Sequence, residues 1–259
     1  MRIVFIRHGD PDYAHDSLTE NGKIEASLLA EHISLFELEQ GDFYVSPLGR
    51  AQDTARYVLD KLGKKAEVLD WLREFPASVD INDSPEMQRA YPDTRKVGDR
   101  YERHFIMDMM PSYWTTHEEY YDRERWREAE IVNHCEVETV YGHVTKELDR
   151  FLEKYGYVRE GRCYRVEKET DITVTCFCHL GIICALLSHL WSVSPFVLWQ
   201  SLALAPTSVT EVYTEEREQG IACFRAVRLG EITHLRIGKV KPSFAGRFCE
   251  VYSNTEERH

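Results

Sequence analysis

The chain has 259 residues, of which 43% are hydrophobic and 29% are charged, and its formal net charge is -12 at pH 7. This length and apolar content suit one α/β domain with an insertion, which can bury a substantial core. The acidic balance argues against a nucleic-acid partner, because such proteins usually carry a clustered basic face.

An apolar run at residues 3–6 comes directly before Arg7, His8 and Gly9. Its β-branched and aromatic residues predict a buried parallel strand that ends in a loop. Polar residues at the end of such a strand usually face a ligand site. Because the run turns polar at Arg7, it is too short for a signal-peptide core or a membrane span. We therefore expect a cytoplasmic protein without a membrane partner.

Further strands and helices are predicted before residue 70. Apolar residues at helical spacing indicate a helix over 24–33, for which Thr19 or Asn21 can serve as the N-cap. Pro47 is placed among the early residues of the next helix, where proline is favoured. The other predicted elements here are a strand at 42–46, a helix at 51–62 and a strand at 66–69.

The regular alternation stops at residue 75, where aromatic residues, prolines, methionines and acidic residues mix. We expect residues 75–135 to form an inserted, mainly helical cap over the active site. The aromatic side chains of the cap suit either a wall against an apolar leaving group or packing of the insertion itself.

The second half of the chain resumes the alternation of strands and helices. The predicted elements are a helix over 136–155, a hairpin over 157–166 with Gly161 at its turn, a strand at 172–178, a helix over 182–191, a helical turn at 195–201, and paired strands at 208–213 and 221–227. Together these elements predict a single domain over residues 1–259, with a three-layer α/β/α fold around a mostly parallel central sheet.

Polar side chains follow three of the predicted strands. Arg7 and His8 come after the first, Ser46 and Arg50 after the second, and His179 after the strand at 172–178. The carboxyl ends of parallel strands meet at one edge of a sheet, so these side chains should converge. Guanidinium groups match phosphate oxygens and stabilise the charge of a phosphoryl transition state, and a neutral imidazole can attack phosphorus.

The seven cysteines follow no disulfide-scaffold spacing, which indicates reduced thiols in a cytoplasm. Two of them, Cys176 and Cys178, lie next to His179 and raise the question of a metal cluster. Alternation along a strand sends both thiols to one face and the imidazole to the other. We therefore interpret the two cysteines as core thiols.

Longer motifs surround the candidate residues. The chain reads Phe-Ile-Arg-His-Gly-Asp at 5–10, Leu-Thr-Glu-Asn-Gly-Lys-Ile-Glu-Ala at 18–26 and Tyr-Val-Ser-Pro-Leu-Gly-Arg-Ala-Gln-Asp-Thr-Ala at 44–55. In these motifs it resembles the histidine phosphatase superfamily, in its phosphoglycerate mutase-like branch. The second motif carries Glu25 where the family usually has glutamine.

The resemblance continues to the C-terminal part of the chain. His179 matches the late histidine of the family, although Leu180 intervenes before the glycine that commonly follows this histidine directly. Residues 205–210 and 229–235 resemble the closing segments of the family. The resemblance therefore spans nearly the whole chain except the cap.

The resemblance implies a set of roles for the polar residues at the strand ends. His8 would become a transient phosphohistidine, while Arg7, Arg50 and His179 would bind the transferred phosphoryl group. No metal ion and no cofactor are expected, because the cationic pocket supplies the positive charge.

A leaving alcohol needs a proton, and in this branch the donor is often a glutamate after the third strand. Glu74 matches that position. The competitors in the same region are Asp80, Asp83 and Glu86.

The segment after the Arg-His-Gly motif bears on the type of reaction. Phosphoglycerate mutases carry a longer segment there, with an asparagine and an arginine, whereas this chain runs directly from Gly9 to Leu18. We therefore predict a metal-independent phosphatase that hydrolyses a small-molecule phosphomonoester. The alternatives are phosphoglycerate mutase-type phosphoryl transfer and a non-catalytic phospholigand-binding module. The substrate and the oligomeric state, a homodimer included, stay open.

Overall fold

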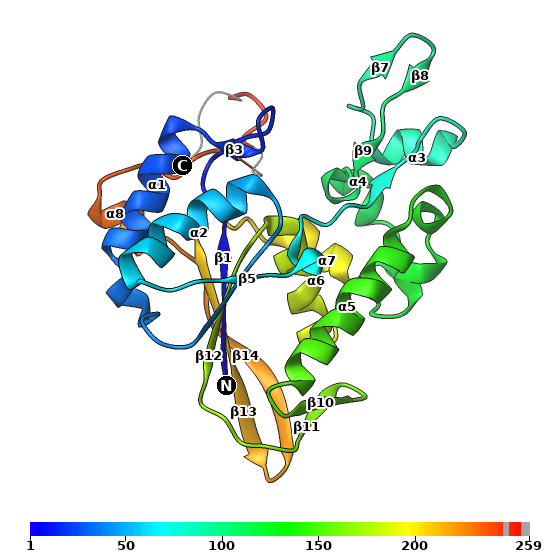
Figure 1. Ribbon diagram of the computed structural model, residues 1–259. Coiled ribbons are helices and arrows are strands. Elements are labelled where there is room, and N and C mark those ends of the chain that lie inside the picture. Colours follow the sequence, from blue (N-terminus) through cyan, green and yellow to red (C-terminus); the bar gives the residue numbers. More distant parts are fainter. Residues whose placement is uncertain (246–248, 255–259) are drawn as a thin grey trace. The chain divides into compact units, whose positions relative to one another are not determined.

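The computed structural model describes residues 1–245 and 249–254 (Figure 1). Contacts divide the chain into two compact units. The first unit comprises Met1–Glu74, Val166–Ile183 and Ala203–His259, and the second comprises Phe75–Arg165 and Cys184–Leu202.

The elements of the described residues are as follows. The strands are β1 (Arg2–Arg7), β2 (Pro11–Asp12), β3 (Ser17–Leu18), β4 (Asp42–Val45), β5 (Glu67–Val68), β6 (Ser78–Val79), β7 (Lys96–Val97), β8 (Arg100–Tyr101), β9 (His104–Phe105), β10 (Tyr157–Glu160), β11 (Cys163–Val166), β12 (Thr173–Cys178), β13 (Val209–Glu218) and β14 (Ile221–Glu231). The α-helices are α1 (Glu20–Glu31), α2 (Gly49–Leu62), α3 (Pro85–Ala90), α4 (Pro111–Trp114), α5 (Val137–Glu153), α6 (Leu180–Trp191), α7 (Pro195–Ser201) and α8 (Thr233–Ile237). The 3₁₀ helices are η1 (Ile33–Phe36), η2 (Asp70–Leu72), η3 (Ile106–Asp108), η4 (Glu118–Tyr121), η5 (Arg125–Glu128) and η6 (Glu130–His134).

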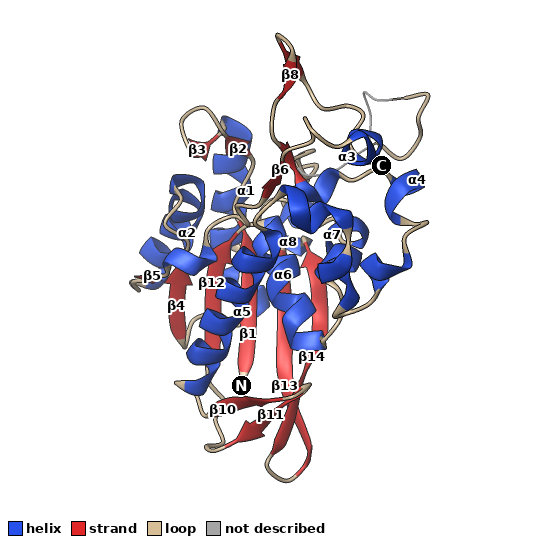
Figure 2. Cartoon of the chain, turned by 90° about the vertical axis from the view of Figure 1, so that its right-hand side faces the viewer, coloured by secondary structure: helices blue, strands red, loops and turns tan. Residues whose placement is uncertain are grey.

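The first unit is built on a mixed β-sheet. Its strands follow the order β14-β13-β1-β12-β4-β5, and Figure 2 shows β4, β12, β1, β13 and β14 side by side. β1 pairs in parallel with β12, β12 with β4, and β4 with β5. β13 runs antiparallel to both β1 and β14. The predicted α/β fold class is confirmed, and its parallel part contains the strands that precede the candidate residues.

One core cluster of the first unit buries one face of β1 and β12. Val4 and Ile6 of β1 are fully buried in one cluster with Phe177 of β12. Leu29 of α1 and Ala55 of α2 belong to the same cluster. Burying one large apolar side chain contributes about 1.5–3 kcal/mol, so this cluster fixes both helices on the sheet.

The starts of the first two helices differ in how well the sequence predicts them. Thr19 is the N-cap of α1, and its hydroxyl accepts a hydrogen bond from the amide of Gly22 at 3.0 Å. The placement of Pro47 inside the next helix is wrong, because α2 begins at Gly49 with Leu48 as its N-cap. The hydroxyl of Ser46 accepts the amide of Leu48 at 3.2 Å, and this contact makes 46–48 a turn after β4.

The strands β13 and β14 are longer than predicted. Beyond residues 213 and 227 their sequences are rich in charged residues, so no apolar alternation marks them as strands. Cross-strand pairing holds them instead, as between Arg225 and Glu215, whose charged atoms are 2.7 Å apart. The predicted hairpin with Gly161 at its turn is present as β10 and β11, with Gly161 at a φ of 60°.

The second unit has its own aromatic core. Tyr120 and Trp126 are almost fully buried and pack against Phe196 of α7 at ring separations of 4.8 and 5.8 Å. In contrast, Phe105 and Tyr121 are exposed. Packing of the insertion therefore accounts for the buried aromatics, while the exposed ones remain available for other contacts. No helix within 1–245 and 249–254 has the length and apolarity that crossing a bilayer requires.

Candidate active site

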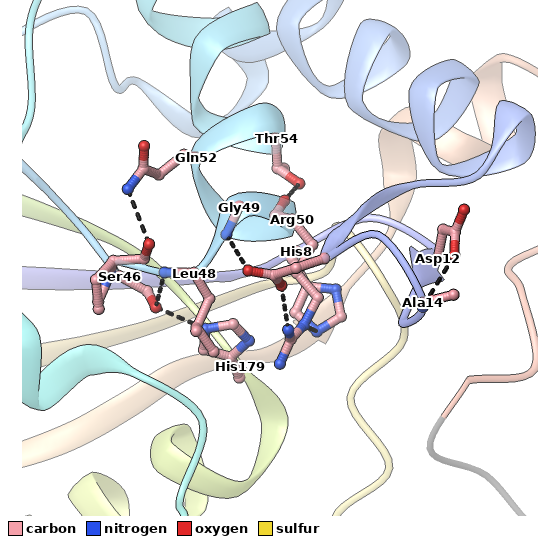
Figure 3. Close-up of polar contacts among 12 residues, drawn as sticks. His8, Asp12, Ala14, Ser46, Leu48, Gly49, Arg50, Gln52, Thr54 and His179 are labelled. Atoms are coloured by element: carbon pink, nitrogen blue, oxygen red, sulfur yellow. Dashed lines mark hydrogen bonds and ion pairs between the residues drawn. The ribbon is translucent and has the colours of Figure 1, made fainter.

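The parallel strands of the first unit bring their polar ends together. The amide of His8 donates to the carbonyl of Cys178 at 3.0 Å, and the amide of Ser46 donates to the carbonyl of Phe177 at 2.9 Å. The first residues beyond β1, β12 and β4 are thus neighbours at one edge of the sheet. The side chains of His8, Arg50 and His179 lie together there (Figure 3).

His8 is held in one tautomer. Its Nδ1 lies 2.7 Å from the carbonyl oxygen of Gly9, which can only accept, so Nδ1 carries the proton and Nε2 keeps a lone pair. The side chain is buried, and burial together with the charges of Arg7 and Arg50 holds the pKa of His8 well below its ordinary value. A neutral imidazole with an unprotonated Nε2 has the form that a nucleophile requires.

Arg50 faces His8 from the first turn of α2. Its Nε lies 3.4 Å from Nε2 of His8, and its Nη1 lies 2.5 Å from Oδ1 of Asp16. The second oxygen of Asp16 accepts the amide of Gly49 at 2.7 Å. Asp16 therefore anchors Nη1 of the guanidinium, while Nε is directed at Nε2 of His8.

The sequence prediction did not include Asp16. The residue has a φ of 46°, a conformation that aspartate tolerates better than most residues. A Cβ on Gly49 would lie 2.2 Å from the backbone oxygen of Asp16, so the close approach requires a glycine at residue 49. Asp16 and Gly49 are 33 residues apart in the sequence, so no periodic pattern predicts their contact. The local sign of the contact is the glycine at the start of α2.

His179 lies beside His8, with 5.0 Å between ring centroids. Its Nε2 is 2.7 Å from the hydroxyl of Ser46, while its buried Nδ1 has no hydrogen-bond partner among the described residues. Burial and the nearby His8 and Arg50 lower the pKa of His179 strongly. The helix α6 begins at Leu180, immediately after this histidine, so the imidazole occupies the strand end as predicted.

Arg7 is buried and donates from Nη1 to the carbonyl oxygens of Leu204 and Ala245, the latter at 2.8 Å. These carbonyls fix one nitrogen of the guanidinium. Because both are uncharged, the positive charge of Arg7 is not neutralised by these two contacts.

Thr207 supports the backbone of His8. Its amide donates to the carbonyl of His8 at 3.2 Å, and its backbone has a φ of 57°. Its hydroxyl lies 2.9 Å from Nε2 of the buried His234, whose pKa is lowered to about 4 by burial. In the sequence, Thr207 and His234 stand out only as members of segments 205–210 and 229–235. Their contact joins positions far apart in the chain, so no local pattern predicts it.

Glu74 also lies in the first unit. Its Oε1 accepts the amide of Ile182 at 3.1 Å, in the first turn of the helix that follows His179. The competing acids Asp80, Asp83 and Glu86 lie in the second unit. There the carboxylate of Asp80 accepts a hydrogen bond from the amide of Asn82, and that of Glu86 accepts one from the hydroxyl of Tyr113.

The thiols near the site are buried. Cys176 and Cys178 are free, and burial raises the pKa of both. Their burial agrees with the interpretation as core thiols. In the described part of the chain, no group of three or more histidine, cysteine, aspartate or glutamate side chains is arranged to hold a metal ion.

Comparison with known proteins supports the resemblance. Residues 3–113 match the model of the histidine phosphatase superfamily, branch 1. The matched segment contains Arg7, His8, Arg50 and Glu74, and the resemblance inferred from the motifs is confirmed.

Solved structures of other phosphatases share the fold of this chain. Phosphoserine phosphatase from Entamoeba histolytica, in complex with 3-phosphoglyceric acid, aligns with a TM-score of 0.57 and 16% identity, over 90% of this chain and 98% of that chain. Mycobacterial glucosyl-3-phosphoglycerate phosphatase with inorganic phosphate aligns with a TM-score of 0.52 and 20% identity, over 90% and 98% of the two chains. A comparison with curated protein sequences found no match.

Proposed function

We propose that this chain is a phosphatase that hydrolyses a small phosphomonoester through a phosphohistidine on His8. The observation that carries the proposal is the pairing of a neutral His8, whose Nε2 has a lone pair, with the Nε of Arg50 at 3.4 Å. A nucleophile and a cationic donor at this distance leave a phosphoryl group within reach of both.

In the first proposed step, Nε2 of His8 attacks phosphorus and the bond from phosphorus to the leaving oxygen breaks. Arg7 and Arg50 stabilise the negative charge that spreads over the phosphoryl oxygens. His179 supplies a further hydrogen bond through Nδ1, which has no hydrogen-bond partner among the described residues. The product of this step is a phosphoenzyme and an alcohol.

Glu74 is the proposed proton donor for the leaving oxygen. Of the four acids considered, it is the one in the same compact unit as His8. The amide of Ile182 holds its Oε1 beside the first turn of the helix that follows His179.

In the second proposed step, water attacks the phosphohistidine and the bond from phosphorus to nitrogen breaks. The carboxylate of Glu74, which lost its proton in the first step, takes one proton from this water. Inorganic phosphate leaves, and both His8 and Glu74 return to their initial states.

The proposal needs neither a metal ion nor a cofactor, because two arginines supply the positive charge. The similar structures include a phosphoserine phosphatase with phosphoserine or 3-phosphoglyceric acid bound and a glucosyl-3-phosphoglycerate phosphatase, which favour a phosphorylated small acid as the class to test first. We further propose that residues 75–135 form the cap that selects the leaving group, that the protein acts in the cytoplasm, and that residues 1–259 form one histidine phosphatase-like domain.

The purified protein should be assayed in EDTA with an aryl phosphate and a panel of phosphorylated small acids, beside His8→Ala. His15→Asn is the matched control, because His15 is an exposed histidine on the following loop. We expect EDTA-resistant turnover in the wild type and in His15→Asn, and a loss of at least about a thousandfold in His8→Ala.

Two other outcomes would count against the proposal. Tight phosphate binding without turnover of any substrate would favour a non-catalytic phospholigand-binding module. Transfer of the phosphoryl group to a phosphoglycerate acceptor, in preference to water, would favour a mutase.

A further inference from the structure

A buried carboxylate on α1 joins the loop after β1 to the C-terminal part of the chain. Glu25 has no exposed surface; its Oε2 accepts the amide of Asp10 at 2.8 Å and its Oε1 accepts the amide of Ser243 at 3.1 Å. We propose that Glu25 is a positioning residue for Arg7, which it serves by holding residues 239–245 against the active site. This inference rests on the proposed function, in which Arg7 binds the phosphoryl group.

The segment that Glu25 holds also contacts Arg7. The carbonyl oxygen of Ala245 accepts from Nη1 of Arg7 at 2.8 Å, and it lies two residues after the amide that Glu25 binds at Ser243. The same nitrogen of Arg7 donates to the carbonyl of Leu204. The carboxylate of Glu25 therefore holds two segments: the backbone of Asp10, which follows His8, and the backbone that leads to the carbonyl contacting Arg7.

The path of the chain after α8 directs this segment toward Glu25. Lys239 has a φ of 55°, and the amide of Val240 donates to the carbonyl of Leu235 at 3.0 Å. These features reverse the chain at the end of α8, which packs against α1. The segment consequently returns along the helix that carries Glu25.

A carboxylate suits this position better than the amide of glutamine, which stands here in the family motif. The two oxygens of Glu25 accept amides from two separate segments, and Oε1 also accepts from the side chain of Asn21 at 3.2 Å. Glutamine has one acceptor oxygen, and its NH₂ group would face a backbone N–H. Burial raises the pKa of Glu25, while the two amide hydrogen bonds and the charge of Arg7 oppose this shift. The site therefore provides donors for both oxygens of a buried acid.

The test uses the full chain with Glu25→Gln and orthovanadate as a phosphoryl-like probe. Glu31→Gln is the matched control, because it makes the same change at an exposed residue of the same helix. Two quantities are measured: the inhibition constant for vanadate and the hydrogen exchange rate of the Ser243 amide, with and without vanadate.

In Glu25→Gln we expect the inhibition constant to rise about tenfold, since the charge-assisted contact that holds Ser243, and through Ala245 positions Arg7, is lost. Exchange at Ser243 should become faster. Vanadate should slow this exchange in the wild type and in Glu31→Gln, and should have a weaker effect in Glu25→Gln. A merely structural role of Glu25 would not link the exchange of Ser243 to occupation of the phosphoryl site.

A second variant reaches the same contact from the other side. Ser243→Pro removes the backbone N–H that donates to Glu25 and leaves the carboxylate in place. This variant therefore tests the inference even if Glu25→Gln fails to fold. Faster exchange with an unchanged inhibition constant, or no change in either quantity, would overturn the inference. A wild-type chain that binds no vanadate would contradict the proposed function, and exchange at Ser243 would then still test whether Glu25 holds the segment.

Discussion

Nδ1 of His8 lies 2.7 Å from the carbonyl oxygen of Gly9, and this contact fixes which ring nitrogen is protonated. Burial and two neighbouring guanidinium groups keep the ring neutral. The fold thereby keeps Nε2 unprotonated, as the proposed attack on phosphorus requires.

The first prediction concerns the protonation of His8. At about pH 6 an ordinary imidazole is mostly charged, whereas we expect the ¹⁵N shifts of His8 to show the neutral Nδ1–H tautomer. The signals are assigned by their absence in His8→Ala, and the exposed His15 serves as the internal reference. An imidazolium at His8 at this pH would contradict the arrangement described here.

The second prediction concerns Glu74→Gln. Loss of a general acid should slow cleavage of an alkyl phosphate by about a hundredfold or more, because an alkoxide is a poor leaving group. A nitrophenyl phosphate should still give a burst of phenolate followed by slow turnover, since this leaving group needs no proton. Glu67→Gln, at an exposed glutamate of β5, should behave as the wild type. Equal losses in the first step for both substrates would remove Glu74 from the role of donor.

The third prediction compares two glycines within helices. Gly142 in α5 has nothing within 4 Å of an added Cβ, so Gly142→Ala should stabilise the protein by about 0.5–1 kcal/mol. Gly49→Ala should destabilise it, because the new Cβ meets the backbone of Asp16. It should also raise the KM, since Asp16 anchors Arg50. Chemical denaturation and steady-state kinetics test both variants, and stabilisation by Gly49→Ala would refute the close approach.

The fourth prediction concerns stability and pH. The pKa values of His8, His179 and His234 are lowered in the folded chain, so the unfolded chain binds more protons below its histidine pKa of about 6.5. The stabilisation is complete above that pH and is lost as pH falls, by up to about 1.4 kcal/mol per pH unit for each histidine. Denaturation between about pH 7.5 and 5 should show this slope. His234→Gln should reduce it. An unchanged slope in His234→Gln would contradict the burial of a neutral imidazole.

Much of the site is predictable from the sequence because local features specify it. Arg7 and His8 follow an apolar strand directly, and His179 follows another. Parallel pairing of these strands, which apolar runs predict, is enough to bring the side chains together. Arg50 follows the same rule through the short turn after β4.

The rest of the site depends on contacts that no local pattern encodes. Asp16 reaches Arg50 and Gly49 across more than thirty residues, and Thr207 reaches His8 from the far end of the chain. Asp16 and Thr207 have positive φ values, which tertiary contacts stabilise against local preference. Glu25 was recognised as a departure from a motif, but its partner Ser243 is found only in the folded chain.

The most direct measurement is detection of the phosphoenzyme itself. The protein is mixed with an aryl phosphate that carries a label on its phosphoryl group. The mixture is quenched in alkali within one turnover, and the protein is digested for peptide mapping. We expect an acid-labile, alkali-stable label on the peptide that contains His8, formed as fast as the burst of phenol and absent in His8→Ala. Turnover without such a label, or a label on any other residue, would contradict the assignment of His8 as the nucleophile.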